Sequence, residues 1–151
     1  MFCFCGKNAI KGFKIFTKDL VSAFAITSTN KLHANFGNGS GWDIGLNSTA
    51  SIPLNTWTHL AVTRQNALFR MYINGQQDSA TATMSATGQN SSHRALGAKL
   101  VGTSLYTNST INGSIDEVRF WSTARTQAQI QASMNTQLVG NESGLLAYYT
   151  F

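Results

Sequence analysis

The sequence is poor in charged residues, and this shortage narrows the classes of protein to consider. Only 11% of its 151 residues are charged, against about 25% in typical soluble domains. A polar surface built mainly from Asn, Gln, Ser, Thr and Gly favours short strands and turns over long exposed helices. Apolar residues make up 42% of the chain and aromatic residues 11%. Their spread along the chain excludes a disordered protein.

Acidic residues are especially scarce, and their positions argue against an enzyme. The chain has six acids, and no two of them are separated by a single residue. Glycoside hydrolysis normally needs two carboxylates that flank the scissile bond. The adjacent Asp116 and Glu117 would point to opposite faces of a strand. The histidines His33, His59 and His93 have neither the close spacing of a metal pair nor an accompanying nucleophile motif. We therefore expect no catalysis.

The net charge of +5 reflects the missing acids and not a basic stripe. The 11 basic residues are scattered along the chain, whereas nucleic-acid binding gathers them on one face or helix. We expect no nucleic-acid partner. No segment approaches the ~20 apolar residues of a transmembrane helix, so no membrane insertion is expected. The segment Met1–Ile10 lacks the basic start and long apolar core of a signal peptide, and we expect none in this chain.

Cysteine is nearly absent. Cys3 and Cys5 are the two cysteines of the chain, and a disulfide across one intervening residue is geometrically awkward. No further cysteine completes a metal-binding set. We therefore predict buried free thiols.

Period-two alternation of apolar residues predicts a chain of short strands. In the segment 69–73, Phe69, Met71 and Ile73 share one face, and the following Asn74-Gly75 favours a tight hairpin. Glycine- and asparagine-rich turns separate most of the segments. The other predicted strands are Phe13–Thr17, Ser22–Ser28, Leu32–Phe36, Trp42–Leu46, Thr58–Arg64, Ala95–Ala98, Ile115–Trp121 and Leu145–Phe151.

One short helix is predicted at 126–134. Thr126 can cap its start, and Ile130 and Met134 would face the sandwich. Many short strands with one minor helix indicate an all-β, two-sheet antiparallel sandwich, not alternating βα units. The length and the lack of repeats or linkers predict a single domain over residues 1–151.

Three segments resemble laminin-G-like jelly-roll domains, the group allied to concanavalin A and the pentraxins. The first is Leu54–Arg64 continuing to Met71–Gly75, the second is Asn112–Trp121, and the third is Gly144–Tyr149. Their order and spacing resemble the family from about Lys31 to the C-terminus. The resemblance implies a concanavalin A-like jelly roll, but it does not imply a particular ligand.

The chain departs from the family pattern at its N-terminus. Family members usually carry further strands before the segment equivalent to Phe2–Thr17, so we expect a truncated chain or a sandwich that closes differently. A missing strand would expose a sheet edge that can pair with another chain. This predicts a homodimer formed through an exposed sheet edge.

Asp116 is the candidate metal ligand. The resemblance implies an occasional calcium site that includes this residue, although the family often draws its calcium ligands from the missing N-terminal part. Calcium takes six to eight oxygen ligands, and no Asp-rich loop supplies them. The alternative is a carboxylate that accepts backbone hydrogen bonds behind a Gly-Ser turn. Calcium is thus the cofactor left open. Glu117 and Arg119 share a strand face and are predicted to form an ion pair.

Trp42 belongs to the first candidate ligand-binding surface. It follows a glycine-rich loop and precedes Asp43, and Asn38 lies in that loop. An exposed aromatic ring beside hydrogen-bonding groups is a usual way to hold a sugar ring. The alternative for Trp42 is half-buried packing within the sandwich.

Tyr106 and Asn108 form the second candidate surface. They lie in the polar segment Thr103–Thr110, which we predict to be a loop, and loops at sandwich ends commonly carry recognition. Trp57 and Trp121 lie in the segments that resemble the family, and we expect both to pack in the core.

These features predict a non-catalytic binding module that recognises carbohydrate. Two alternatives remain open. The first is a structural or adhesion module that binds an extracellular protein or self-associates, and the second, weaker one is a degenerate glycoside hydrolase. By resemblance we expect the chain outside the cell or within a secreted protein.

Overall fold

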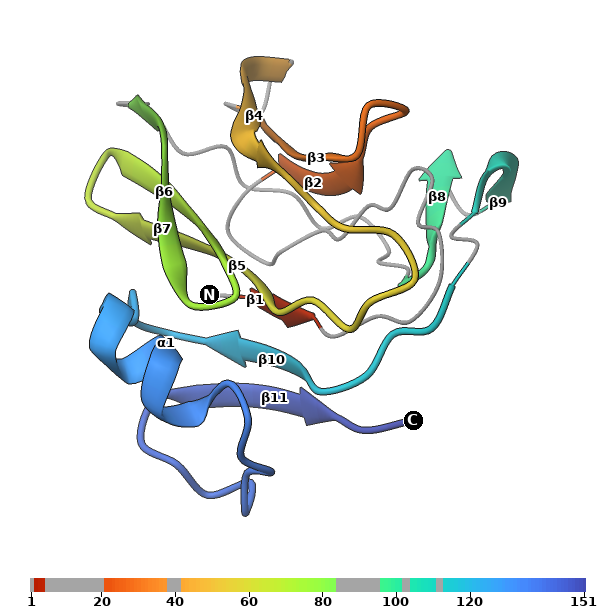
Figure 1. The fold of residues 1–151 in the computed structure, drawn as a ribbon. Coiled ribbons are helices and arrows are strands. Elements are labelled where there is room, and N and C mark those ends of the chain that lie inside the picture. Colours follow the sequence, from red (N-terminus) through yellow and green to blue (C-terminus); the bar gives the residue numbers. More distant parts are fainter. Residues whose placement is uncertain (1, 5–20, 38–41, 84–95, 102–103, 111–112) are drawn as a thin grey trace.

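Antiparallel strands make up most of the described structure (Figure 1). It is a computed structural model and describes residues 2–4, 21–37, 42–83, 96–101, 104–110 and 113–151. Every strand pair in these residues is antiparallel. The predicted all-β class is therefore confirmed. The strands are β1 (Phe2–Phe4), β2 (Val21–Ile26), β3 (Lys31–Gly37), β4 (Trp42–Ser51), β5 (Leu60–Gln65), β6 (Leu68–Ile73), β7 (Gln76–Thr83), β8 (Ala98–Val101), β9 (Ser104–Thr110), β10 (Val118–Trp121) and β11 (Leu145–Tyr149), and the helix is α1 (Gln127–Ser133).

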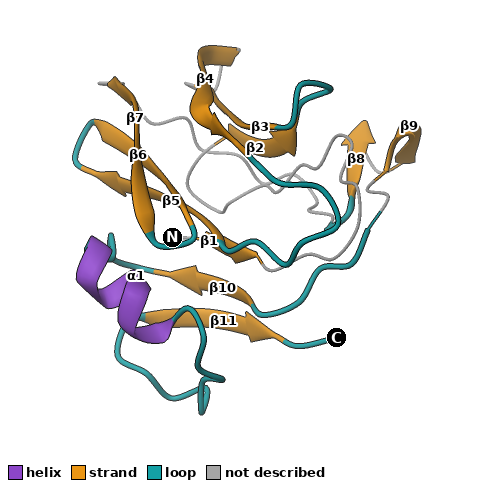
Figure 2. Ribbon diagram, viewed as in Figure 1, coloured by secondary structure: helices purple, strands orange, loops and turns teal. Residues whose placement is uncertain are grey.

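The strands form two layers with two smaller strand pairs beside them. One sheet has the order β1-β5-β6-β7 and the facing sheet has the order β2-β3-β4. The pairs are β10-β11, which runs next to β1, and β8-β9 (Figure 2). Figure 1 shows the helix against the outer side of the first sheet, away from β2-β3-β4.

The main core lies between the two layers. Phe24, Leu32 and Leu46 come from the three-stranded sheet, and Phe69 and Met71 come from β6. All five side chains are buried in one cluster. Phe69 and Met71 are two residues apart, so they share a face, as the alternation predicts. Burying such side chains is the main favourable term in holding the sheets together.

A second, smaller core lies under the helix. Ala61 of β5, Tyr72 of β6 and Trp121 of β10 are buried there against Ile130 of α1. These strands therefore bury both faces, one against the facing sheet and one against the helix. The burial of Trp121 and of Ile130 confirms two predictions made from the sequence.

The helix begins and ends where its sequence signals predict. Thr126 is the N-cap, and its side chain and that of Gln129 form a reciprocal capping box. Met134 is the C-cap. The helix packs on the β6–β7 turn, where Asn74 and Gly75 both have positive φ, as the predicted hairpin requires.

Two predicted strands and one predicted loop differ from the structure, each for a local reason. Residue Gly97 has a φ of +78° and β8 begins after it, at Ala98; the predicted start at Ala95 lies outside the described residues. Likewise Glu117 has a φ of +56°, and the strand predicted from Ile115 begins only at Val118. The prediction of a polar loop at Thr103–Thr110 is wrong, because residues 104–110 form β9. Its Thr, Tyr and Ser residues are polar, but β-branched and aromatic residues favour strands. The predicted strand Phe13–Thr17 lies outside the described residues.

Candidate functional site

A surface hollow of about 310 Å³ lies between the start of β10 and the chain that follows α1. It combines an aromatic ring with charged and amide side chains. Pockets that bind small molecules begin at about this volume and share this mixture of apolar and polar lining. The lining residues are Trp57, Asp116, Glu117, Arg119, Met134, Asn135, Thr136 and Gln137.

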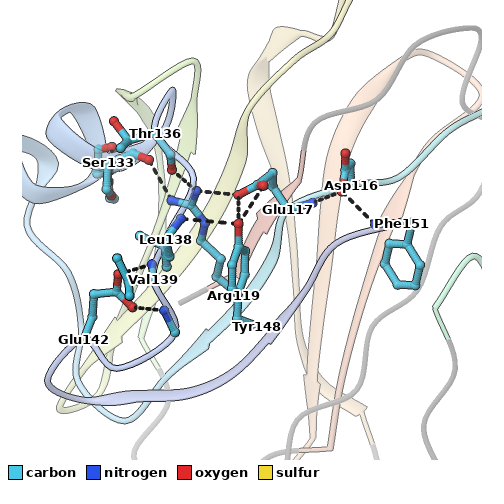
Figure 3. Close-up of polar contacts among 12 residues, drawn as sticks. Asp116, Glu117, Arg119, Ser133, Thr136, Leu138, Val139, Glu142, Tyr148 and Phe151 are labelled. Carbon is cyan, nitrogen blue, oxygen red and sulfur yellow. Dashed lines mark hydrogen bonds and ion pairs between the residues drawn. The ribbon is translucent and has the colours of Figure 1, made fainter.

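Arg119 forms the base of this hollow and is almost completely buried, with 1% of its surface exposed. Its Nη1 donates to the carbonyl oxygen of Ser133 (2.7 Å), and its Nη2 donates to that of Thr136. These carbonyls lie at and just beyond the C-terminal end of α1, where backbone oxygens lack helical partners. Arg119 thereby fixes the end of the helix to β10 (Figure 3).

Glu117 neutralises this guanidinium. Its Oε2 lies 2.6 Å from Nη2 of Arg119, so the predicted ion pair is confirmed. The pair does not arise from a shared strand face, because Glu117 precedes β10 and has a φ of +56°. Both carboxylate oxygens also accept from the hydroxyl of Tyr148 at 2.7 Å. Partial burial and this hydrogen bond raise the pKa of Tyr148 above its ordinary value.

Asp116 forms the other acidic part of the lining. Its Oδ1 accepts from the backbone N–H of Glu117 (2.8 Å) and from that of Phe151 (3.0 Å). This is the backbone-binding role given above as the alternative to calcium. Within the described residues, Oδ2 has no hydrogen-bond partner. Asp116 stays a predicted calcium ligand, and the described part of the chain contains no group of three or more His, Cys, Asp or Glu that could hold a metal ion.

Trp57 corrects a prediction. It was expected in the core, but 38% of its surface is exposed and it lines the hollow. The reason is local: β5 begins at Leu60, so Trp57 lies in the preceding loop, whose turn places Asn55 at a φ of +56°.

The histidines occupy sheet and loop positions. His33 of β3 has its Nδ1 2.7 Å from Oδ1 of Asn47 on the neighbouring β4. His59 lies before β5 and is buried, and its Nδ1 has no hydrogen-bond partner among the described residues. Burial, with a smaller contribution from the charge of Arg119, lowers the pKa of His59 to about 4. His93 lies outside the described residues.

The ligand candidates chosen from the sequence are placed only in part. Trp42 and Asp43 open β4, and Trp42 pairs with Gly37 of β3. Tyr106 and Asn108 lie in β9, where Tyr106 pairs with Lys99. Asn38 lies outside the described residues, as does Cys5, while Cys3 pairs with Ala61. None of these candidates lines the hollow around Trp57.

The groups in the hollow are suited to holding a ligand. Arg119 and Glu117 form an ion pair with each other. The groups that remain to contact a ligand are the Trp57 ring, Oδ2 of Asp116 and the amides of Asn135 and Gln137. Both amide residues are exposed, and in the described part of the chain neither amide makes a hydrogen bond. No helix in the described residues is long and apolar enough to cross a membrane.

The two-layer antiparallel fold is that of a lectin-like jelly roll. The model of the concanavalin A-like lectin/glucanases superfamily, in its laminin G form, matches residues 14–131. The chain belongs to this superfamily, and the resemblance noted in the sequence is confirmed.

Solved structures share the fold at low sequence identity. A proposed carbohydrate binding protein from Bacteroides ovatus superposes with a TM-score of 0.73 at 19% identity over 99% of this chain. The chain spans 44% of that structure. A heptameric SAP-like pentraxin from Limulus polyphemus superposes with a TM-score of 0.61 at 14% identity, over 88% of this chain and 69% of the pentraxin. A search of curated protein sequences gave no significant match.

Proposed function

We propose that the chain is a non-catalytic module that binds carbohydrate outside the cell. The observation that carries the proposal is the exposed ring of Trp57 at the rim of the hollow, beside the carboxylate of Asp116 and the amides of Asn135 and Gln137. An aromatic ring offers a flat apolar surface to the C–H face of a sugar. Carboxylate and amide groups exchange hydrogen bonds with its hydroxyls. Superfamily membership supports the same function by analogy alone.

The charges of the hollow favour neutral sugars over acidic ones. Its guanidinium, on Arg119, is paired with Glu117 at 2.6 Å. The carboxylate of Asp116 has no such cationic partner in the described residues. A sulfated or sialylated glycan would bring a second negative charge next to Asp116, which is unfavourable. This preference runs against the +5 charge of the whole chain, which would attract anionic glycans.

The absence of catalysis is part of the proposal. The oxygens of Glu117 accept hydrogen bonds from Arg119 and Tyr148, and Asp116 accepts two backbone bonds on one oxygen. A glycosidase needs one carboxyl group to act as the general acid. The arrangement supports binding without bond cleavage.

A glycan array tests the function and its location together. The array is probed with the wild-type chain, Trp57→Ala and Trp42→Ala, each with calcium and again with chelator. The proposal predicts binding to neutral glycans that Trp57→Ala abolishes and Trp42→Ala leaves intact. Loss on Trp42→Ala alone would move the site to the start of β4, where Asn38 and Asp43 are its predicted partners. Silence of the folded wild-type chain on every glycan would overturn the proposed function and favour a protein-binding or adhesion module.

Calcium is tested by the same array. A wild-type signal that disappears with chelator, and that Asp116→Asn also removes, would make Asp116 the calcium ligand that the family resemblance implies. The proposal predicts an equal signal in calcium and in chelator, because the sugar-binding groups in the hollow are side chains of the protein itself.

A further inference from the structure

The outer edge of β11 is an unprotected strand edge. In the described part of the chain, β11 pairs only with β10. The segment Leu145–Phe151 contains no charged residue, no proline and no glycine. Soluble proteins usually protect such edges with charges, prolines or bulges. The one protective feature here is a register shift between Phe120 and Trp121, which leaves Leu146 as the extra residue on β11.

Three large apolar side chains of this segment are exposed. Leu146 is 67% exposed, Tyr149 is 48% exposed and Phe151 is 74% exposed. The ring of Tyr149 lies edge-on to that of Phe120, with centroids 6.2 Å apart. Large apolar side chains grouped on one element mark a surface that another strand or protein can cover.

The direction of the backbone groups can be deduced from the hydrogen bonds at the C-terminus. The backbone N–H of Phe151 donates to Asp116, on the β10 side. Because backbone groups alternate along a strand, those of Tyr149 also point toward β10. The N–H and C=O of Tyr148 and Thr150 therefore point outward, away from β10. An antiparallel partner strand would need these two residues.

We propose that β11 pairs antiparallel with β11 of a second copy of this chain, around a two-fold axis at Tyr149. In this register the outward backbone groups of Tyr148 meet those of Thr150 in the second copy, and the reverse holds across the axis. The two Tyr149 side chains then lie directly opposite each other as a close cross-strand aromatic pair. The result is one sheet that continues through both copies.

A second copy is the partner that the charges favour. A two-fold interface pairs this segment with its own copy, so charged side chains of one sign on it would lie close to like charges of the other copy. The segment Leu145–Phe151 has no charged side chain to repel its copy, although each whole chain carries +5. The same segment supplies both donors and acceptors, so it is complementary to itself.

Sedimentation velocity on the full chain tests this pairing over about 1 to 100 µM, where mass action shifts a dimer equilibrium. Tyr149→Lys places two positive charges opposite each other at the axis. Thr150→Pro removes one outward N–H from each copy. Val139→Lys is the matched control, because it adds the same charge at an exposed apolar residue outside β11. Circular dichroism and the Tm establish that each variant is folded.

The proposal predicts dimers for the wild-type chain and for Val139→Lys, and monomers for folded Tyr149→Lys and Thr150→Pro. It also predicts that the dimer persists in high salt, since no charged side chain lies on the pairing segment. A wild-type chain that stays monomeric throughout the range would overturn the proposal. So would a dimer that both Tyr149→Lys and Thr150→Pro retain, or one that dissociates as salt is added. Because Trp57 lies outside β11, this test is independent of the glycan array.

Discussion

Asp78 on β7 accepts a hydrogen bond of 2.8 Å from the backbone N–H of Thr49 on β4, and this bond joins the edge strands of the two sheets. The same oxygen accepts from the hydroxyl of Thr49, and Oδ2 accepts from the N–H of Ala50. Burial alone would raise the pKa of Asp78, but the N–H groups of Thr49, Ala50 and Ala80 lower it below its ordinary value. The carboxylate of Asp78 thus joins β7 to β4, two strands that belong to different sheets.

Asp78→Asn should therefore weaken this closure. The amide nitrogen of Asn would face a backbone N–H in place of an acceptor, so one buried donor would lose its partner at a cost of about 2 kcal/mol. For a chain of this length, that cost corresponds to a fall in Tm of about 5 °C. Urea denaturation measures the loss. Ser79→Ala, at an exposed neighbour that also contacts Thr49, is the control and should change the free energy of unfolding by less than about 0.5 kcal/mol.

The buried His59 should make the fold sensitive to mild acid. Its pKa is about 4 in the folded chain and about 6.5 for an ordinary histidine, so the native state binds fewer protons than the unfolded state between these pH values. The free energy of unfolding should stay constant above pH 6.5 and fall by about 3 kcal/mol as the pH drops from 6.5 to 4. His59→Phe removes the titrating group, and its unfolding free energy should fall less over this window. Parallel curves for the two proteins would contradict this account.

Glu117 and Tyr148 should be energetically coupled. The hydroxyl of Tyr148 bonds to both carboxylate oxygens, and hydrogen bonds to charged groups are stronger than neutral ones. A double-mutant cycle with Glu117→Gln and Tyr148→Phe should give a coupling free energy of about 1 kcal/mol. Strictly additive effects would mean that the network contributes nothing as a unit. In an absorbance titration, Glu117→Gln should also bring the raised pKa of Tyr148 back toward its ordinary value.

Gly75 should tolerate a methyl group worse than Gly140 does. Both have positive φ, so alanine is strained at either position. At Gly75 an added Cβ would also lie 2.8 Å from Cγ of Gln131 and 2.9 Å from Sδ of Met134, whereas at Gly140 it meets nothing within 4 Å. Gly140→Ala should cost about 1 kcal/mol from backbone strain alone. Gly75→Ala should cost more because the side chains of Gln131 and Met134 must move away, and equal losses in urea denaturation would contradict the packing of α1 on this turn.

The sequence was most informative where one local signal decides the structure. Thr126 caps the helix because its hydroxyl can reach a backbone N–H three residues on, and this requirement is visible in the sequence. Alternation likewise predicted the burial of Phe69 and Met71, because residues two apart on a strand lie on the same face. It failed for β9, because Leu105 is the one aliphatic residue of that strand and a single aliphatic residue sets up no alternation. The sequence pattern also did not reveal the hydrogen bonds from β4 to Asp78, since the partners of Asp78 are 28 and 29 residues away.

The candidate site was less predictable than the fold. The pairing of Glu117 with Arg119 was foreseen, but its partners Ser133, Thr136 and Tyr148 come from distant elements that only the packing of α1 brings together. The exposure of Trp57 depends on where β5 begins, and a shift of two residues changes a core side chain into a rim side chain. Boundaries of this kind are set by tertiary contacts, so the sequence pattern does not fix them.

The most direct test of the proposed function is an isothermal titration of the strongest neutral glycan from the array into wild-type, Trp57→Ala and Leu54→Ala proteins. Leu54 is the matched control, because it is an exposed apolar residue of the same loop and does not line the hollow. The account predicts that Trp57→Ala weakens binding at least about tenfold, a loss of about 1.4 kcal/mol, while Leu54→Ala binds like the wild type. Equal affinity of all three proteins would contradict it.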